Sequence, residues 1–424
     1  MEFKLDAEQS AAVHATDKNV IVVAGAGSGK TRVITERIKY LLTTGVDPSS
    51  IVAITFTNMA ADEMKARLKD VPNLGDAFIG TLHSFANRIY HNSGETYSIM
   101  NDEQQQLIME EICNLPKYKG QLTIKRYLQY LDLCKKVDLG QLDENAPMDF
   151  LNPSERNVIY TCQDEFERIR RRDHIITFDE LLKYAQGYFK GLGASCDHVL
   201  VDEFQDIGSL EWGFIQGLNA EHYFLVGDDY QAIYGFKGGN VDIFKSLVNR
   251  PNTGYTTYFL RNNYRSKRKI IEFAEQIIQQ CPNRIRKRAN VQVEGIGYVT
   301  VDRKQNTGTI VDMLRKDKSN WRDWFVLTRS NKEAYQLADL FDDEGIDYAF
   351  LRRSDMTLDE LNQALKRNLV KIMTVHSAKG LENKKVILFG NFPIKPPVYF
   401  KNDEERRVMY VGITRAIDEL HLFN

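Results

Sequence analysis

A glycine-rich segment behind a short apolar run is the part of this chain whose residue types best fit a chemical role. Residues 20–23 are all Val or Ile and predict a buried strand, and residues 24–31 read AGAGSGKT. Glycines let successive backbone N–H groups converge on a polyphosphate, Lys30 supplies a positive charge for the β and γ phosphates, and Thr31 offers a hydroxyl to Mg²⁺. Ala24 stands where the usual pattern has glycine. With the amphipathic segment 32–42 behind it, the loop predicts a nucleoside triphosphate site.

Two adjacent carboxylates follow a second apolar run, residues 198–201. If that run is a parallel strand, Asp202 and Glu203 lie at the carboxyl edge of the sheet beside the phosphate loop. Asp202 is then the metal-side group and Glu203 the general base that polarises water, as phosphoryl transfer to water requires. The alternative is a solvated acidic loop. A further strand at 223–226 is followed by Gln231, which we predict to sense the γ-phosphate.

The arrangement of apolar runs predicts an α/β fold. Residues 20–90 alternate strand and helix patterns, which is typical of a parallel sheet. Residues 91–177 change to long polar helical segments and predict a helical insertion. The strands at 198–201 and 223–226 are expected to rejoin the first sheet. From residue 258 onward, further strand and helix patterns predict a second parallel-sheet domain.

Composition narrows the possible function classes. The 424 residues suit two to four domains, and the net charge of −2 means that any nucleic-acid affinity must come from a local groove. The five cysteines occur singly with no CxxC pair, so we expect reduced thiols and no zinc or iron–sulfur centre. The polar N-terminus and the lack of an apolar run of about 18 residues predict a cytoplasmic protein without an export signal or membrane span.

Nine ordered motifs are similar to those of superfamily 1 helicases of the UvrD/Rep/PcrA group. They are LDAEQ from Leu5, GAGSGKTR from Gly25, AITFTNMAADEM from Ala53, GTLHSFA from Gly80, VDEFQD from Val201, GDDYQAIYGFKGG from Gly227, NNYRS from Asn262, TVHSAKGLE from Thr374 and EERRVMYVGITRA from Glu404. The resemblance implies two tandem RecA-like domains of the P-loop NTPase type. Residues 1–90 and 178–254 are expected to form the ATP-binding domain, 91–177 the helical insertion, and 255–424 the second domain, with little or no 2B insertion.

The same resemblance implies roles around ATP. Arg265 and Arg415 would reach from the second domain to the γ-phosphate as arginine fingers, although a lone arginine is more often a surface ion pair. Gln9 would read the adenine edge and Glu382 would lie near the sugar. The remaining expected nucleotide contacts are Ala26, Gly27, Ser28, Gly29, Lys30, Thr31, Arg32 and Tyr264, with Arg32 and Tyr264 on the two faces of adenine. Thr31 and Asp202 would hold the metal.

DNA contacts are implied by the same motifs. Aromatic rings that could stack on bases are Phe56, Tyr234 and Phe236, and candidate phosphate or sugar contacts are Thr57, Asn58, His83 and His376. Taken singly, each aromatic residue is more often part of a core, and each histidine more often has a structural role. Stacking tolerates both sugars, so RNA stays open as the strand bound.

The implied function is an ATP-dependent 3′–5′ DNA helicase and translocase that acts on single-stranded DNA and on junctions with duplex. The alternatives are a translocase that displaces proteins or serves a nuclease without unwinding alone, and a nucleotide-gated nucleic-acid sensor. A nuclease or a replication or repair protein is the expected partner, and a monomer the expected state. The short stretch between Arg265 and Thr374, and the end of the printed chain soon after Arg415, make strand separation the open question. Tyr230 and Lys237 depart from the family's usual acid and arginine.

Overall fold

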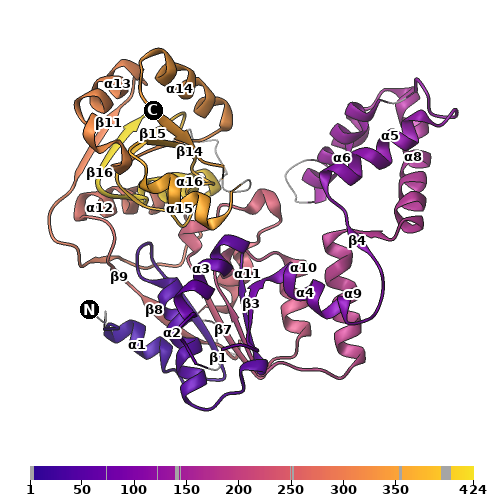
Figure 1. Ribbon diagram of the computed structural model, residues 1–424, viewed down its shortest axis with the longest axis horizontal. Coiled ribbons are helices and arrows are strands. Elements are labelled where there is room, and N and C mark those ends of the chain that lie inside the picture. The colour runs from indigo at the N-terminus through magenta and orange to yellow at the C-terminus, as the bar shows by residue number, and fades with distance from the viewer. Residues whose placement is uncertain are drawn as a thin grey trace.

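The computed structural model describes residues 4–72, 74–121, 123–138, 143, 145–248, 250, 253–352, 356–392 and 403–424. Two α/β domains lie against each other, and a helical arm projects from one of them (Figure 1). Each domain is built on a six-stranded sheet whose strand pairs are all parallel. These two sheets confirm the predicted α/β fold class. In the described part of the chain, no helix combines the length and apolar character needed to cross a bilayer.

The first sheet has the strand order β3-β2-β6-β7-β1-β8. Its strands are β1 (Asn19–Ala24), β2 (Ile51–Thr55), β3 (Phe78–Thr81), β6 (His198–Val201), β7 (His222–Gly227) and β8 (Thr256–Leu260). Side chains alternate across a strand, so Val20 and Val22 pack into one core and Ile21 and Val23 into the other. Both faces are therefore buried, as parallel sheets require.

Helices cover the two faces of this sheet in separate groups. α1 (Ala7–Val13), α2 (Lys30–Thr43) and α3 (Asn58–Leu68) contribute to the core around Val20. α4 (Leu82–His91), α9 (Phe178–Gly191), α10 (Ser209–Gly217) and α11 (Val241–Leu247) contribute to the core around Ile21.

The edge strand β8 corrects the expected domain boundary. The sequence patterns predict that residues from 255 onward belong to the second domain, but β8 pairs with β1 along Val20–Thr256 to Ala24–Leu260. The first sheet therefore includes β8, and the chain passes to the second half only after Leu260. β9 (Asn262–Asn263) begins after a single further residue, Arg261, and pairs with β10 (Asn290–Val291).

The helical arm occupies much of the region predicted as an insertion. It contains α5 (Asp102–Asn114), α6 (Ile124–Asp138), α7 (Ala146–Phe150) and α8 (Pro153–Arg172). These helices bury a core of their own that includes Ile112, Tyr127 and Phe166. A short parallel pair, β4 (Ser98–Ile99) with β5 (Ile175–Ile176), lies where the arm joins the first domain (Figure 1).

The second sheet has the order β11-β16-β15-β12-β14-β13. Its strands are β11 (Tyr298–Asp302), β12 (Trp324–Thr328), β13 (Tyr348–Phe350), β14 (Val370–Thr374), β15 (Asn383–Phe389) and β16 (Ala416–Phe423). The helices around it are α12 (Arg268–Ile278), α13 (Thr307–Lys316), α14 (Asn331–Asp343), α15 (Leu358–Lys366) and α16 (Asp403–Ile413). Each helix contributes buried residues to one of the two cores on this sheet.

One of those cores continues across the domain junction. It contains Ala26, Met59, Tyr230 and Ile233 from the first domain, together with apolar residues of α12, α16 and the second sheet. The two domains are therefore in contact where the carboxyl ends of the first sheet's strands carry the predicted site.

Candidate nucleotide site and nucleic-acid groove

The phosphate loop connects β1 to α2, and two of its glycines have left-handed backbone angles. Gly27 has φ +66° and Gly29 has φ +84°, a region that L side chains rarely adopt. Lys30 is the first residue of α2, so the unpaired N–H groups of that helix face the loop. The loop is fastened from within, because the Ser28 hydroxyl donates to the Gly25 carbonyl at 2.8 Å. This geometry matches a polyphosphate cradle.

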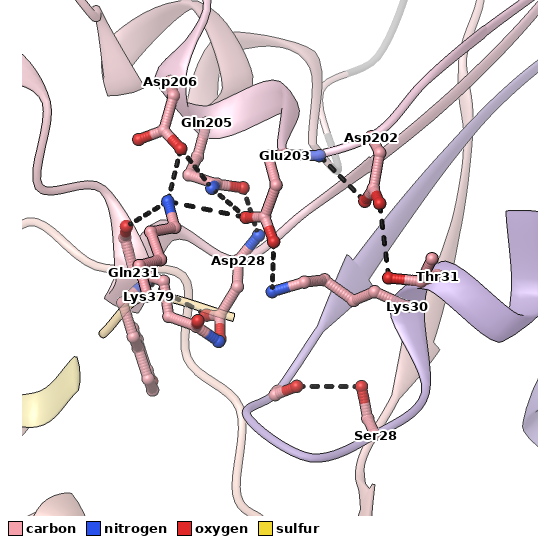
Figure 2. Close-up of polar contacts among 12 residues, drawn as sticks. Ser28, Lys30, Thr31, Asp202, Glu203, Gln205, Asp206, Asp228, Gln231 and Lys379 are labelled. Atoms are coloured by element: carbon pink, nitrogen blue, oxygen red, sulfur yellow. Dashed lines mark hydrogen bonds and ion pairs between the residues drawn. The ribbon is translucent and has the colours of Figure 1, made fainter. Parts of the chain in front are cut away.

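The two carboxylates after β6 lie beside the loop, as the sequence predicts (Figure 2). The Thr31 hydroxyl donates to Asp202 Oδ2 at 3.4 Å, and Lys30 Nζ lies 3.5 Å from Glu203 Oε1. Glu203 has φ +53°, a strained conformation for a residue with a side chain. That conformation turns the chain sharply after the strand, so the neighbouring carboxylates point to different partners.

The two carboxyl groups titrate in opposite directions. Burial, together with the charge of Glu203, raises the pKa of Asp202 to about 7. Burial alone would also raise the pKa of Glu203, but Lys30 and Lys379 outweigh it and lower that pKa. A carboxylate that stays ionised suits the general base, and a buried carboxyl with a raised pKa is stabilised in its charged form by a bound cation, which suits a metal ligand.

The expected Mg²⁺ fits this donor set only if phosphate completes it. Thr31 and Asp202 supply one hydroxyl and one carboxylate, and no cluster of three or more His, Cys, Asp or Glu among the described residues could hold a metal by itself. Mg²⁺ is usually held by one or two protein oxygens plus substrate phosphates. When bound there, it would neutralise the phosphate charge that develops during phosphoryl transfer.

Lys379 of the second domain enters the same site, and sequence reasoning did not assign it a role. Its ammonium bonds the Asp206 carboxylate, donates to the Gln231 carbonyl at 3.0 Å and lies 3.5 Å from Glu203 Oε2. Burial would lower the pKa of Lys379, but Asp206 and Glu203 raise it, so the ammonium stays charged. Its place inside the TVHSAKGLE motif was the available signal.

The two predicted arginine fingers come from the second half of the chain and line one cavity with the phosphate loop. That cavity has a volume of about 450 Å³, and Lys30, Glu203 and Gln231 also line it. Arg415 is buried, and its Nη2 lies 3.5 Å from Gln231 Oε1. Arg265 makes a close ion pair with Glu382 and donates from Nη1 to the Thr414 carbonyl at 3.2 Å.

Electrostatics distinguish one of these arginines. Burial and the neighbouring Arg265 lower the pKa of Arg415 to about 9. Two guanidinium groups so close together favour the arrival of an anion between them. The Arg415 guanidinium donates to the backbone carbonyls of Val411 and Leu381 and to the side chains of Gln231 and Thr414. All four acceptors are uncharged, and no carboxylate among the described residues accepts a hydrogen bond from it.

The predicted adenine contacts lie near the start of the chain's first helix. Tyr264 is about half exposed, its hydroxyl donates to Asp6 at 2.5 Å, and burial and Asp6 raise its pKa to about 12. Arg32 lines the nucleotide cavity. Gln9 is buried, its amide donates to the Ser28 carbonyl at 2.9 Å, and its carbonyl accepts from the Asp6 N–H at 3.2 Å. Gln9 therefore braces the phosphate loop in this structure.

The predicted DNA-contacting aromatic residues form one cluster. Phe56 stacks on Tyr234 with ring centroids 4.8 Å apart, and Phe236 meets His376 edge to face at 5.4 Å. Phe236 is 43% exposed, so its ring is available to a base. Thr57 caps α3 by accepting from the Ala60 N–H. These rings stand on both domains, because Phe56 follows β2 and His376 follows β14.

A polar cavity of about 630 Å³ continues from this cluster along the second domain. Phe236, Thr374 and His376 line it together with Arg329, which sequence reasoning missed. Arg329 is held by a two-point ion pair with Glu405, with N–O distances of 2.8 and 2.5 Å. Burial and the charge of Arg329 lower the pKa of His376 to about 4, so that ring is neutral at pH 7. The position of Arg329 directly after an apolar strand was the available signal.

Two predicted contacts lie outside the aromatic cluster. Asn58 is the first residue of α3, one position after Thr57. His83 is in the first turn of α4 and packs edge to face on Phe178 at 4.8 Å. Burial lowers the pKa of His83. Among the described residues, no ring contact joins His83 to the cluster around Tyr234.

Comparison with known proteins assigns both halves of the chain. Residues 5–252 match the profile described as the UvrD/REP helicase N-terminal domain. Residues 258–355 and 348–423 match the UvrD-like helicase C-terminal domain. The first profile alone covers more than half of the 424 residues.

Curated relatives agree with the profiles. A probable DNA helicase from Mycoplasma pneumoniae is 29% identical over 99% of this chain and 83% of its own length. A probable DNA helicase II homolog from Mycoplasma capricolum is 30% identical over 77% of this chain, and the ATP-dependent DNA helicase PcrA from Staphylococcus epidermidis is 26% identical over 82%. The match spans about half the length of these last two proteins.

Proposed function

The chain belongs to the UvrD/REP helicase family, and from that premise we propose that it is an ATP-dependent DNA helicase. It hydrolyses ATP between two RecA-like domains and moves 3′ to 5′ along single-stranded DNA. The observation that carries the proposal is one cavity, which Lys30 and Glu203 line from the first domain and Arg265 and Arg415 line from the second half of the chain.

Hydrolysis follows from that placement. Lys30 and the loop N–H groups bind the phosphates, and Glu203 orients and deprotonates the attacking water. Gln231 is linked to Glu203 through Asp228 and Gln205, and its Oε1 lies 3.5 Å from Arg415 Nη2. Arg265 and Arg415 add positive charge that is most useful when the phosphoryl group carries most negative charge in the transition state. Because the arginines come from the second half, turnover requires both domains to be in contact. Mg²⁺ is the metal that we propose for Thr31 and Asp202.

We propose that ATP turnover is coupled to DNA through the short segment that joins the nucleotide cavity to the aromatic cluster. Gln231 contacts the nucleotide cavity, and Tyr234 and Phe236 follow it within five residues, on the aromatic cluster. Tyr234 also donates to the His376 carbonyl of the second domain at 3.3 Å. A change at the γ-phosphate position therefore displaces the rings on which bases stack, which is the motion a translocating motor needs.

A translocase that displaces proteins or serves a nuclease, without unwinding alone, is the second candidate. One observation favours it: the described helices between Arg265 and Thr374 all contribute to the second sheet's cores. In that part of the chain no further subdomain is described that could grip duplex. Monomeric action, a cytoplasmic location and a nuclease, replication or repair partner stay predictions.

An unwinding assay separates the two candidates. Duplexes with a 3′ tail, a 5′ tail or no tail are mixed with protein and ATP, and strand release and ATP turnover are followed in the same samples. Release from the 3′-tailed duplex alone supports the helicase. Turnover stimulated by single strands without release supports the translocase. Slow turnover that none of these duplexes stimulates contradicts both and favours a nucleotide-gated nucleic-acid sensor.

A further inference from the structure

A buried lysine joins the two halves of the chain next to the nucleotide site, and no motif used above contains it. Lys287 lies between α12 and β10. Its ammonium is 2.7 Å from the Asp228 carboxylate, 2.5 Å from that of Asp229 and 3.9 Å from the centre of the Tyr230 ring. The lysine side chain is 4% exposed and both aspartates are fully buried. One lysine, two aspartates and the face of an aromatic ring are therefore buried together.

The backbone around Lys287 is fastened to the same residues. The Ile285 N–H donates to Asp229 Oδ2 at 2.8 Å, and the Tyr230 hydroxyl donates to the Ile285 carbonyl at 2.9 Å. Ile285 packs against the core of the first domain, while α12, just before it in the chain, packs in the core on the second sheet. The segment from 282 to 289 is therefore held by both domains. We call it the clamp segment.

From Asp228 the contacts lead directly to the residues that act on phosphate. Gln231 Nε2 donates to Asp228 Oδ2 at 2.7 Å. The Asp228 N–H donates to Gln205 Oε1 at 2.8 Å, and Gln205 Nε2 donates to Glu203 Oε2 at 2.6 Å. The Asp228 side chain alone separates Lys287 from Gln231, whereas the path to Glu203 runs through the Asp228 backbone N–H and the Gln205 side chain. Figure 2 shows Gln205 and Asp228 between Glu203 and Gln231.

We propose that Lys287 is a positioning residue for ATP hydrolysis, which fixes Asp228 and through it the γ-phosphate sensor Gln231 and the general base Glu203. The inference rests on the proposed ATPase function. The ammonium holds one carboxylate oxygen of Asp228, so the other oxygen is presented to Gln231 in one orientation. A buried polar network is rigid when every member has a partner, and it loses its geometry when a central partner is removed.

Tyr230 contributes an aromatic ring and a hydroxyl to the surroundings of Lys287. It is one of the two positions at which the motif departs from the family pattern, which has an acid there. An acid at 230 would offer Lys287 a third carboxylate, whereas the tyrosine offers a ring face and a hydroxyl for the clamp segment. Tyr230 therefore adds a ring contact and a hydrogen bond to the clamp segment, and the ion pairs of Lys287 are made with Asp228 and Asp229.

The test must separate positioning from simple charge neutralisation. Lys287→Met alone leaves two buried carboxylates unpaired and is expected to lower stability. The deciding variant is the double change Lys287→Met with Asp229→Asn, which removes one cation and one anion together. Lys287→Arg keeps the charge and serves as the conservative rescue. Lys371→Met is the matched control, because Lys371 is also buried but donates to the carbonyls of Arg322 and Arg367.

ATP turnover with saturating single-stranded DNA is measured for each full-length variant, with thermal melting on the same samples. We expect the double variant to melt near the wild type, to keep its KM for ATP within about twofold and to lose about tenfold or more in kcat. Lys287→Arg should recover most of kcat, and Lys371→Met should lose none when folded. A folded double variant with wild-type kcat overturns the inference. A wild type without DNA-stimulated turnover instead overturns the proposed function.

Discussion

The backbone N–H of Tyr264 donates to the carbonyl of Gly27 at 2.9 Å, so the phosphate loop is bonded to the segment that carries Arg265. Asn263 adds a second bond, from Nδ2 to the Ala26 carbonyl at 2.6 Å. The predicted phosphate loop is thus also hydrogen-bonded to the segment that begins the second half of the chain. Gly27 meets two demands at once, because its φ is +66° and a Cβ there would lie 2.7 Å from Arg265 Cβ.

Replacing Gly27 with Ala should therefore remove ATP turnover by forcing this contact open. The backbone strain alone costs about 1 kcal/mol. Gly45→Ala is the matched control, since Gly45 has φ +89° and no atom within 4 Å of an added Cβ. Thermal melting and ATPase rates are compared. Equal losses of activity in the two variants would show that strain, and not the clash with Arg265, is responsible.

Lys30→Ala and Glu203→Gln should fail at different stages. Lys30→Ala removes the positive charge that binds the phosphates, and it leaves Glu203 with only one of its two neighbouring lysines. ATP binding itself should therefore be lost. Glu203→Gln keeps the shape but cannot accept a proton, so ATP should bind with little turnover. Fluorescent-nucleotide binding and phosphate release distinguish the two, and normal turnover in either variant contradicts the assigned chemistry.

Arg415→Ala should lower kcat far more than it changes nucleotide affinity. Arginine fingers are worth about 10³-fold or more in kcat because they act on transition-state charge. Arg415→Lys should restore little, since a lysine cannot reproduce the forked contacts to Gln231 and the Leu381 carbonyl. Arg315→Ala, which breaks an exposed pair with Glu344, is the control. Single-turnover rates and binding constants supply the comparison.

Phe236→Ala should leave basal ATPase intact and weaken its stimulation by single-stranded DNA. Loss of one stacked base is worth about 1–3 kcal/mol. Tyr298→Ala removes another exposed ring, on β11 at the edge of the second sheet, and should change nothing. The DNA concentration for half-maximal stimulation is the readout. Unchanged stimulation in Phe236→Ala would remove this ring from the DNA path.

Asp202 should make metal binding depend on pH. Its pKa in the folded protein is about 7, against an ordinary value of 3.8, so it holds a proton between these values that the unfolded chain has lost. Its contribution to stability therefore falls as pH rises from about 4 to 7. Mg²⁺ needs the ionised form, so its affinity should fall below pH 7. Melting curves with and without Mg²⁺ and nucleotide, for the wild type and Asp202→Asn, test this. Identical pH slopes for the two proteins would contradict it.

The sequence predicted the parts of the site that local patterns encode. Lys30, Thr31, Asp202 and Glu203 follow apolar strands, and the structure places them together because parallel strands end at one edge. The expected ends of elements were close as well: α2 begins at Lys30 instead of Arg32.

Local sequence patterns do not predict contacts between residues that are far apart in the chain. β8 reads as the start of new material because its pairing with β1 joins residues more than 200 positions apart. Lys287 looks like an ordinary surface lysine until its carboxylate partners, Asp228 and Asp229, are known, and both lie in the first domain. Burial of a charge depends on what packs over it, which no local pattern reports.

The single residue between β8 and β9 has a mechanical consequence. Arg261 is the whole connection between β8, at the edge of the first sheet, and β9, which pairs with β10 outside the two six-stranded sheets. Arg265 follows β9 within two residues. A tether of one residue limits how far the segment that carries Arg265 can move from the edge strand β8, so this arginine stays within reach of the phosphate loop.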